Sequence, residues 1–125
     1  MAGRHLLMGK SDSLGQFEQL VLAAVKKIEN AYAVPIQAMV EQLSQKRVRF
    51  ASVYTALDRL EEKAYVTSRE ADPTPLRGHQ PKRYYTITPT GDGALRDSFD
   101  TAGRFRELFG ANPWESGTQP KKSTI

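Results

Sequence analysis

Apolar residues recur every three or four positions in three stretches of the N-terminal half of the chain. These stretches cover residues 14–28, 34–42 and 51–63. Such spacing places the apolar side chains on one helical face, so each stretch is predicted to form an amphipathic α-helix. Pro35 falls in the first turn of the second helix, where proline is tolerated. Three short helices with tight connections predict a helix-turn-helix arrangement.

Two β-prone runs follow, YVTSRE at residues 65–70 and KRYYTIT at residues 82–88. The eleven residues between them contain three prolines and one glycine, which is typical of a hairpin tip. Three helices followed by a strand, a loop and a strand have the order of a winged helix. The predicted fold class is therefore mainly α with a small β-hairpin wing (α+β).

A fourth helix is predicted to begin near Thr90, capped by Thr90 or Thr88. Apolar residues repeat along it, and an isolated helix of this length is marginal in water unless its apolar face is packed. The first helix also has a wider apolar face than a surface helix needs, so we expect a homodimer. The expected interface consists of Leu14, Phe17, Leu22, Leu95, Phe99, Ala102, Phe105, Leu108 and Phe109.

The 125 residues are enough for one modest core. The chain contains no cysteine, which excludes a disulfide framework and thiolate metal sites. No apolar run approaches the roughly 18 residues of a membrane span. Motifs of nucleophilic or phosphate-transfer enzymes are missing as well. We therefore expect a cytoplasmic protein that is not an enzyme and needs no metal or cofactor.

The positive charge is concentrated in the middle of the chain. The net charge is +4, and residues 46–83 hold nine Lys or Arg against five Asp or Glu. The rest of the chain is balanced. A surface that binds phosphates would produce this pattern, and so would a solvated basic face.

The third predicted helix can keep its apolar row buried while its outer row approaches base edges in the major groove of DNA. Cations ahead of the helix and on the hairpin would contact backbone phosphates. For Tyr54 the alternative is packing against the wing, and for Arg59 it is an ion pair with acidic neighbours in the same helix. The predicted DNA-binding residues are Lys46, Arg47, Arg49, Ser52, Tyr54, Thr55, Arg59, Arg77, His79, Lys82 and Arg83.

Four aromatic residues are candidates for a ligand pocket at the dimer centre. They are Phe17, Phe99, Phe105 and Trp114. The alternative is an ordinary dimer core.

The stretches LGQFEQLVLAAV, AYAVPI, SVYTALDRLEEKAYV and KRYYTITPTGDGAL together resemble the PadR family of bacterial winged-helix transcriptional regulators. The resemblance covers about residues 14–95 and implies a dimer that docks two recognition helices in DNA and usually represses transcription. Some members of that family respond to small aromatic or cationic compounds. Family members usually carry glycine where this chain has Ala33, Ala51 and Ala64, so any left-handed turn at those positions is expected to be remodelled.

These observations predict four segments: a disordered arm at 1–12, a winged helix-turn-helix DNA-binding domain at 13–89, a dimerisation helix at 90–110 and a flexible tail at 111–125. The expected function is that of a homodimeric, sequence-specific repressor on a pseudo-palindromic operator. The alternative is a winged-helix interaction module that binds an acidic protein.

Overall fold

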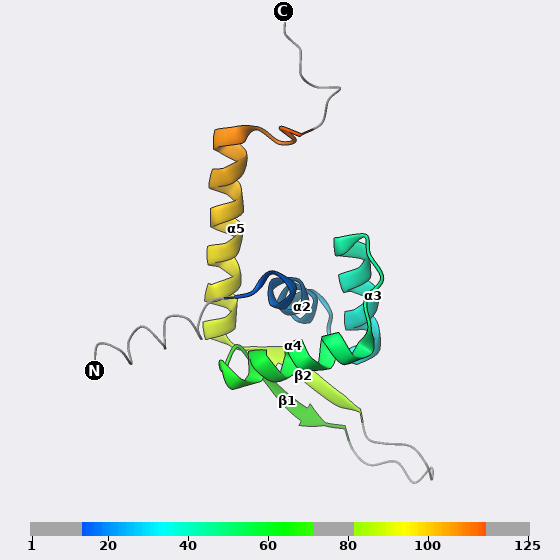
Figure 1. The fold of residues 1–125 in the computed structure, drawn as a ribbon. Coiled ribbons are helices and arrows are strands. Elements are labelled where there is room, and N and C mark those ends of the chain that lie inside the picture. Colours follow the sequence, from blue (N-terminus) through cyan, green and yellow to red (C-terminus); the bar gives the residue numbers. More distant parts are fainter. Residues whose placement is uncertain (1–13, 72–81, 115–125) are drawn as a thin grey trace, which may run out of the picture. The chain divides into compact units, whose positions relative to one another are not determined.

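The computed structural model describes residues 14–71 and 82–114. Within them it has four α-helices and one antiparallel β-hairpin, which confirms the expected winged-helix fold (Figure 1). In chain order the elements are α2 (Gln16–Lys27), α3 (Ala33–Ser44), α4 (Phe50–Glu62), β1 (Val66–Glu70), β2 (Arg83–Ile87) and α5 (Pro89–Phe109). The expected arm, most of the hairpin loop and the end of the tail lie outside the described residues.

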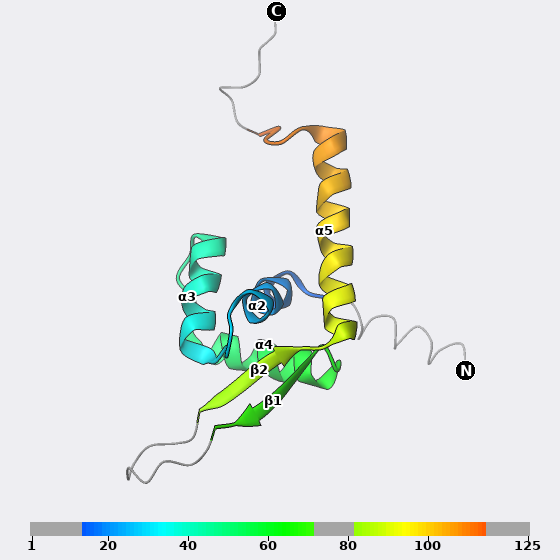
Figure 2. The same ribbon diagram turned by 180° about the vertical axis from the view of Figure 1, so that it is seen from behind.

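Helix α2 is surrounded by other elements of the same chain. It contacts α3, α4 and β2, and α4 in turn contacts β1, as can be followed from both sides in Figures 1 and 2. The strands pair with Val66 opposite Ile87. A single backbone bridge extends the sheet, because the Tyr85 N–H donates to the Ala31 carbonyl oxygen at 2.8 Å.

The helices and β1 enclose one apolar core. Its largest fully buried side chains are Leu22, Ile36, Leu57, Leu60, Val21, Val40, Val53 and Val66. The apolar row of α4 that was expected to face inward is buried, and it consists of Val53, Ala56, Leu57 and Leu60. Apolar area of this kind stabilises a fold by about 25 cal/mol per Å² removed from water.

Two residues expected at the dimer interface belong to this core instead. Leu22 is fully buried and Leu95 is 5% exposed, so neither offers a surface to a second copy, and the prediction was wrong for both. The wide apolar face of α2 has a different cause. As the central helix, α2 is covered on several sides by its own chain.

Helix α4 ends in a Schellman motif whose left-handed residue is Ala64 (φ 63°). The Ala64 N–H donates to the Glu61 carbonyl oxygen at 2.9 Å, and the Tyr65 N–H donates to that of Leu60 at 2.9 Å. This is the position where glycine is usual. The expectation that the turn would be remodelled is therefore wrong at Ala64, where alanine adopts the left-handed conformation. Ala33 and Ala51 lie in helices, where no left-handed residue is needed.

We expect Ala64→Gly to stabilise the protein by about 0.5–1 kcal/mol. The left-handed conformation costs an L-residue about 1–2 kcal/mol, and the greater flexibility of glycine in the unfolded chain offsets part of that gain. Urea denaturation of both proteins gives the difference. Ala38→Gly is the matched control, because Ala38 is exposed within α3 and its replacement should cost about 1 kcal/mol. An equal loss of stability in Ala64→Gly and Ala38→Gly would contradict the conclusion that the left-handed conformation strains Ala64.

Thr88 joins the hairpin to α5, as one of the two predicted caps. Its hydroxyl accepts from the Gly91 N–H at 3.0 Å and donates to the Ala64 carbonyl oxygen at 2.7 Å. Gly91 itself is buried, and a Cβ there would lie 2.2 Å from the Tyr65 carbonyl oxygen. Glycine is therefore required for the start of α5 to approach the end of α4.

The chain divides into two compact units, Met1–Leu95 and Arg96–Ile125. The first contains the winged helix, and the second contains the remainder of α5 and the residues after it. No helix in the described part of the chain has the length and apolar character needed to cross a membrane.

Candidate nucleic-acid interface

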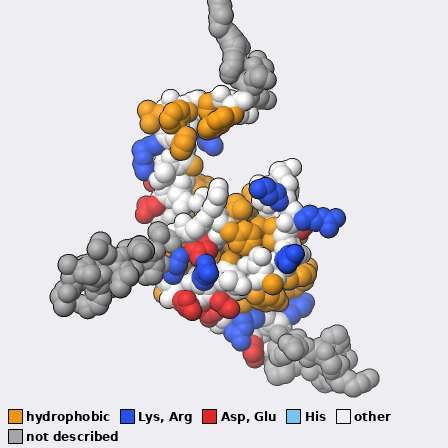
Figure 3. All heavy atoms as spheres, in the orientation of Figure 1, with side chains coloured by type: hydrophobic (Ala, Val, Ile, Leu, Met, Phe, Trp, Pro, Cys, Tyr) orange, Lys and Arg blue, Asp and Glu red, His pale blue; other side chains and the backbone are white. Residues whose placement is uncertain are grey.

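The connection between α3 and α4 presents three cations to solvent. Lys46, Arg47 and Arg49 are all exposed, and within the described residues none of them forms an ion pair. Figure 3 shows Lys and Arg side chains gathered over this connection, at the right-hand edge of the view. Cations without an internal partner are available to an external anion, although exposure alone fits a solvated basic face equally well.

Two side chains of α3 fix the backbone of this connection. The Gln37 amide donates to the Val48 carbonyl oxygen at 2.8 Å, and the Val48 N–H donates to a Glu41 carboxylate oxygen at 2.8 Å. Both polar groups of the extended residue are therefore satisfied by α3. Sequence reasoning missed Gln37 and Glu41. One signal for them was available in the sequence. A residue such as Val48, which lies between two helices and outside any sheet, needs hydrogen-bond partners for its N–H and carbonyl groups from elsewhere in the chain.

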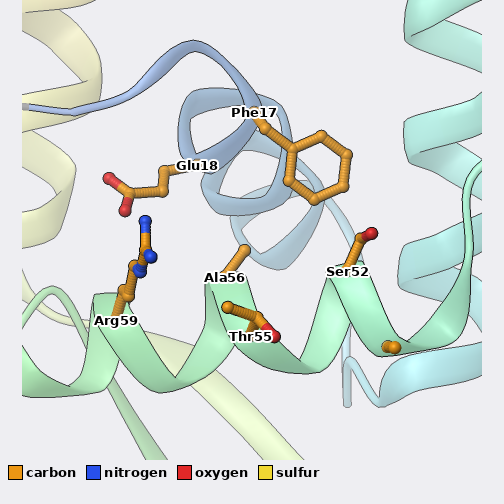
Figure 4. A pocket seen from close by; sticks show the side chains of 7 residues that line it. Phe17, Glu18, Ser52, Thr55, Ala56 and Arg59 are labelled. Carbon is orange, nitrogen blue, oxygen red and sulfur yellow. The ribbon is translucent and has the colours of Figure 1, made fainter.

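One edge of the outward surface of α4 faces the first turn of α2. Ser52, Thr55 and Arg59 line a hollow of about 320 Å³ there. The other lining residues are Phe17, Glu18, Ala51 and Ala56. In Figure 4 the Phe17 ring lies beside Ser52 and over Ala56, and the Arg59 side chain points toward Glu18. In the described part of the chain Arg59 forms no ion pair with its acidic neighbours on α4.

The opposite edge of α4 faces the hairpin. Tyr54 is half-exposed and lines a second hollow, of about 820 Å³, together with Tyr85 of β2. The complete lining is Tyr32, Ala33, Val34, Tyr54, Asp58, Glu61, Glu70, Lys82, Arg83 and Tyr85. Three carboxylates make this edge less basic than the edge that faces α2. Two of these carboxylates, Asp58 and Glu61, place negative charge on the second half of α4.

Of the hairpin cations predicted to bind DNA, the two that the structure describes already have partners within the chain. Arg83 donates to a Glu70 carboxylate oxygen at 3.1 Å and to the Ser68 hydroxyl at 3.0 Å. The Lys82 ammonium lies 4.4 Å from the centre of the Tyr32 ring. A phosphate would have to compete with these contacts. Arg77 and His79 lie outside the described residues.

A partly buried ion pair ties the start of α2 to the end of α4. The Lys63 ammonium donates to a Glu18 carboxylate oxygen at 2.6 Å, and the same oxygen accepts from the Gly15 N–H at 3.0 Å. Burial opposes ionisation of Glu18, but the hydrogen bonds from Lys63 and Gly15 outweigh it and hold the pKa of Glu18 below its usual value. The pair keeps α2 and α4 together beside the 320 Å³ hollow.

Glu18→Gln is expected to destabilise the protein by about 2 kcal/mol at neutral pH, because it removes a charged hydrogen-bond partner from the partly buried Lys63. A lowered pKa in the folded state means that Glu18 stabilises the fold above its ordinary pKa of 4.5 and loses this effect as pH falls through the folded value. The difference between wild type and variant should therefore shrink in acid. Urea unfolding at neutral pH and near pH 3 tests this, with exposed Glu29→Gln as control. A difference that does not depend on pH would contradict the assignment.

The second unit exposes a cluster of large apolar side chains. Phe99, Phe105, Leu108 and Phe109 are 66%, 51%, 79% and 56% exposed, and Trp114 is 78% exposed. The Phe105 and Phe109 ring centres are 4.9 Å apart. In Figure 3 hydrophobic side chains gather toward the end of α5. Large exposed apolar side chains of this kind are typical of interaction surfaces.

Comparisons with known proteins agree with the fold. Solved structures of PadR-family regulators from Eggerthella lenta DSM 2243, Bacillus cereus strain ATCC 14579 and hypervirulent Clostridium difficile R20291 are similar, with TM-scores of 0.61, 0.62 and 0.60. Their sequence identities to this chain are 19%, 16% and 18%. The matches cover 87%, 79% and 76% of this chain and 89%, 92% and 95% of the respective structures.

Among curated proteins, none matches the chain significantly. The model of the transcriptional regulator PadR-like family matches residues 21–97, which include α3, α4, both strands and the start of α5. This match covers more than half of the chain and includes three of the four stretches on which the resemblance was based, together with the end of the first. The chain therefore belongs to the PadR-like family of transcriptional regulators.

Proposed function

We propose that the protein is a homodimeric, sequence-specific DNA-binding repressor that places α4 of each subunit in a major groove. The observation that carries this proposal is the set of three exposed cations on the connection immediately before α4, none of which forms an ion pair with another described residue. Gln37 and Glu41 hold the backbone of this connection in place. Because the backbone of the connection is fixed in this way, little backbone conformational entropy is lost on binding. The remaining proposed contacts divide between phosphates and bases.

The phosphate contacts come from residues around α4. Lys46, Arg47 and Arg49 neutralise backbone charge on one side of the helix, and hairpin cations do so on the other side. These contacts provide affinity and register but carry no sequence information. Tyr54, half-exposed on the hairpin side of α4, contributes its hydroxyl to a phosphate.

Base contacts come from the first half of α4. Ser52 and Thr55 are exposed there, and short hydroxyl side chains allow the helix backbone to come close to the base edges. The second half carries Asp58, Glu61 and Glu62, which are repelled by phosphates. Arg59, on the same edge as Ser52, reaches a phosphate at the groove wall.

The dimer forms mainly through the apolar residues of the second unit. We assign to the interface the exposed side chains Phe99, Ala102, Phe105, Leu108 and Phe109, together with the partly buried Leu14. Packing these side chains against a second copy removes their apolar surface from water, whereas in a single chain they stay exposed. A two-fold dimer requires a pseudo-palindromic operator. A small aromatic effector would be accommodated among Phe99, Phe105 and Trp114 at the dimer centre.

The test is selection of bound sequences from a pool of random DNA duplexes, using the full-length protein. We expect enrichment of a two-fold symmetric motif and binding that weakens steeply with salt. A module that uses its basic face for an acidic protein would enrich no motif, and its attraction to duplexes would be generic. Absence of any enriched motif would overturn the proposed function.

A further inference from the structure

An aromatic ring stands at the rim of the DNA-facing surface proposed for α4. Phe17, in the first turn of α2, is partly buried and lines the 320 Å³ hollow together with Ala51, Ser52 and Thr55 of α4. Its ring lies beside the Ser52 side chain (Figure 4). Sequence reasoning had grouped Phe17 with the dimer interface, because the position of its ring relative to α4 cannot be read from helical spacing.

The walls of this hollow differ from one side to the other. Glu18 and Arg59 are charged and face each other on the side away from Ser52 (Figure 4). On the remaining walls, the Phe17 ring and the Ala51, Ala56 and Thr55 methyl groups are apolar, and the Ser52 and Thr55 hydroxyls are hydrogen-bond donors and acceptors. In the major groove, thymine is the base that presents a methyl group, and its O4 acceptor lies next to that methyl. An apolar wall beside hydroxyl donors therefore matches the edge of thymine better than the edge of any other base.

We propose that Phe17 is a specificity-determining residue and that the hollow between α2 and α4 receives the 5-methyl group of one thymine in each half-site. The inference rests on the proposed DNA-binding function. In the bound state the methyl group packs against the Phe17 ring and Ala51, and a hydroxyl of Ser52 or Thr55 donates to thymine O4. Specificity at this base pair then comes partly from α2, outside the recognition helix.

Thymine-to-deoxyuridine scanning of a selected duplex tests the proposal, because deoxyuridine lacks the methyl group but keeps O4 and the base pairing. For the wild type, one thymine position per half-site should show about a fourfold loss of affinity on replacement, the effect of removing one buried methyl group. In Phe17→Ala this loss should disappear, while the effects at other thymines remain. Phe17→Leu keeps an apolar side chain and should retain part of the effect.

Leu20→Ala is the matched control for packing, because Leu20 is also a partly buried α2 residue that packs against the core. Its truncation should lower stability and leave the deoxyuridine profile unchanged. A wild-type profile without a methyl-sensitive thymine would overturn the inference, and so would a profile that Phe17→Ala leaves unaltered. An unaltered profile is the result expected if Phe17 only packs against the core of its own chain. Neither of these two outcomes contradicts the proposed DNA-binding function. Failure to enrich any motif would contradict both that function and the role of Phe17.

Discussion

Phe105→Asp is expected to convert the dimer into a monomer that has lost its affinity for the operator. Phe105 is 51% exposed in the single chain, so the substitution removes little internal packing. In the dimer it would place two carboxylates where two rings were buried. Burying a phenylalanine contributes about 1.5–3 kcal/mol, so two copies correspond to roughly a 100- to 10,000-fold weaker dimer. Operator affinity falls when the dimer weakens, because the two subunits no longer bind the two half-sites as one unit.

Sedimentation velocity at micromolar concentration measures the oligomeric state, and circular dichroism checks that the monomer is folded. Glu107→Ala is the matched control, because Glu107 is exposed on the same helix and lies on the side opposite Phe105 by helical spacing. The control should sediment as the wild type does. A Phe105→Asp variant that sediments as a dimer would show that the interface lies elsewhere.

Arg47→Ala is expected to weaken binding to every duplex and to reduce its salt dependence. Each lost phosphate contact lowers the slope of log affinity against log salt by about 0.9, so the two subunits together should lower it by about 2. At low salt we expect roughly a 10- to 100-fold loss of affinity, while the preference among sequences stays the same.

Fluorescence anisotropy with the selected duplex over a range of salt concentrations gives both quantities. Lys27→Ala is the control, because Lys27 is an exposed cation in the last turn of α2, outside the proposed interface. It should change neither affinity nor slope beyond a small general effect of charge. If Arg47→Ala behaved like this control, the assignment of the connection to phosphate binding would be wrong.

Much of the fold could be predicted from the sequence because local patterns determine it. Helical spacing predicted α2, α3, α4 and α5 with ends within about two residues, and the β-prone runs predicted both strands. The buried row of α4 was also predictable, since the period of a helix fixes which side chains share a face.

The errors and omissions concern contacts between residues far apart in the chain. The apolar surplus of α2 was attributed to a dimer interface, yet Leu22 is covered by the other elements of its own chain. The partly buried ion pair of Glu18 and Lys63 joins residues 45 positions apart, which no short motif reveals. Likewise, the clamp that Gln37 and Glu41 form on Val48 depends on the path of the chain after α3.

The most direct test of the account is a hydroxyl-radical footprint of the full-length protein on the selected duplex. Two copies of α4 held by a two-fold dimer should protect two patches on each strand, related by symmetry and about 34 Å apart along the duplex. A single protected patch, or uniform protection without symmetry, would contradict the claim that a dimer reads DNA through α4.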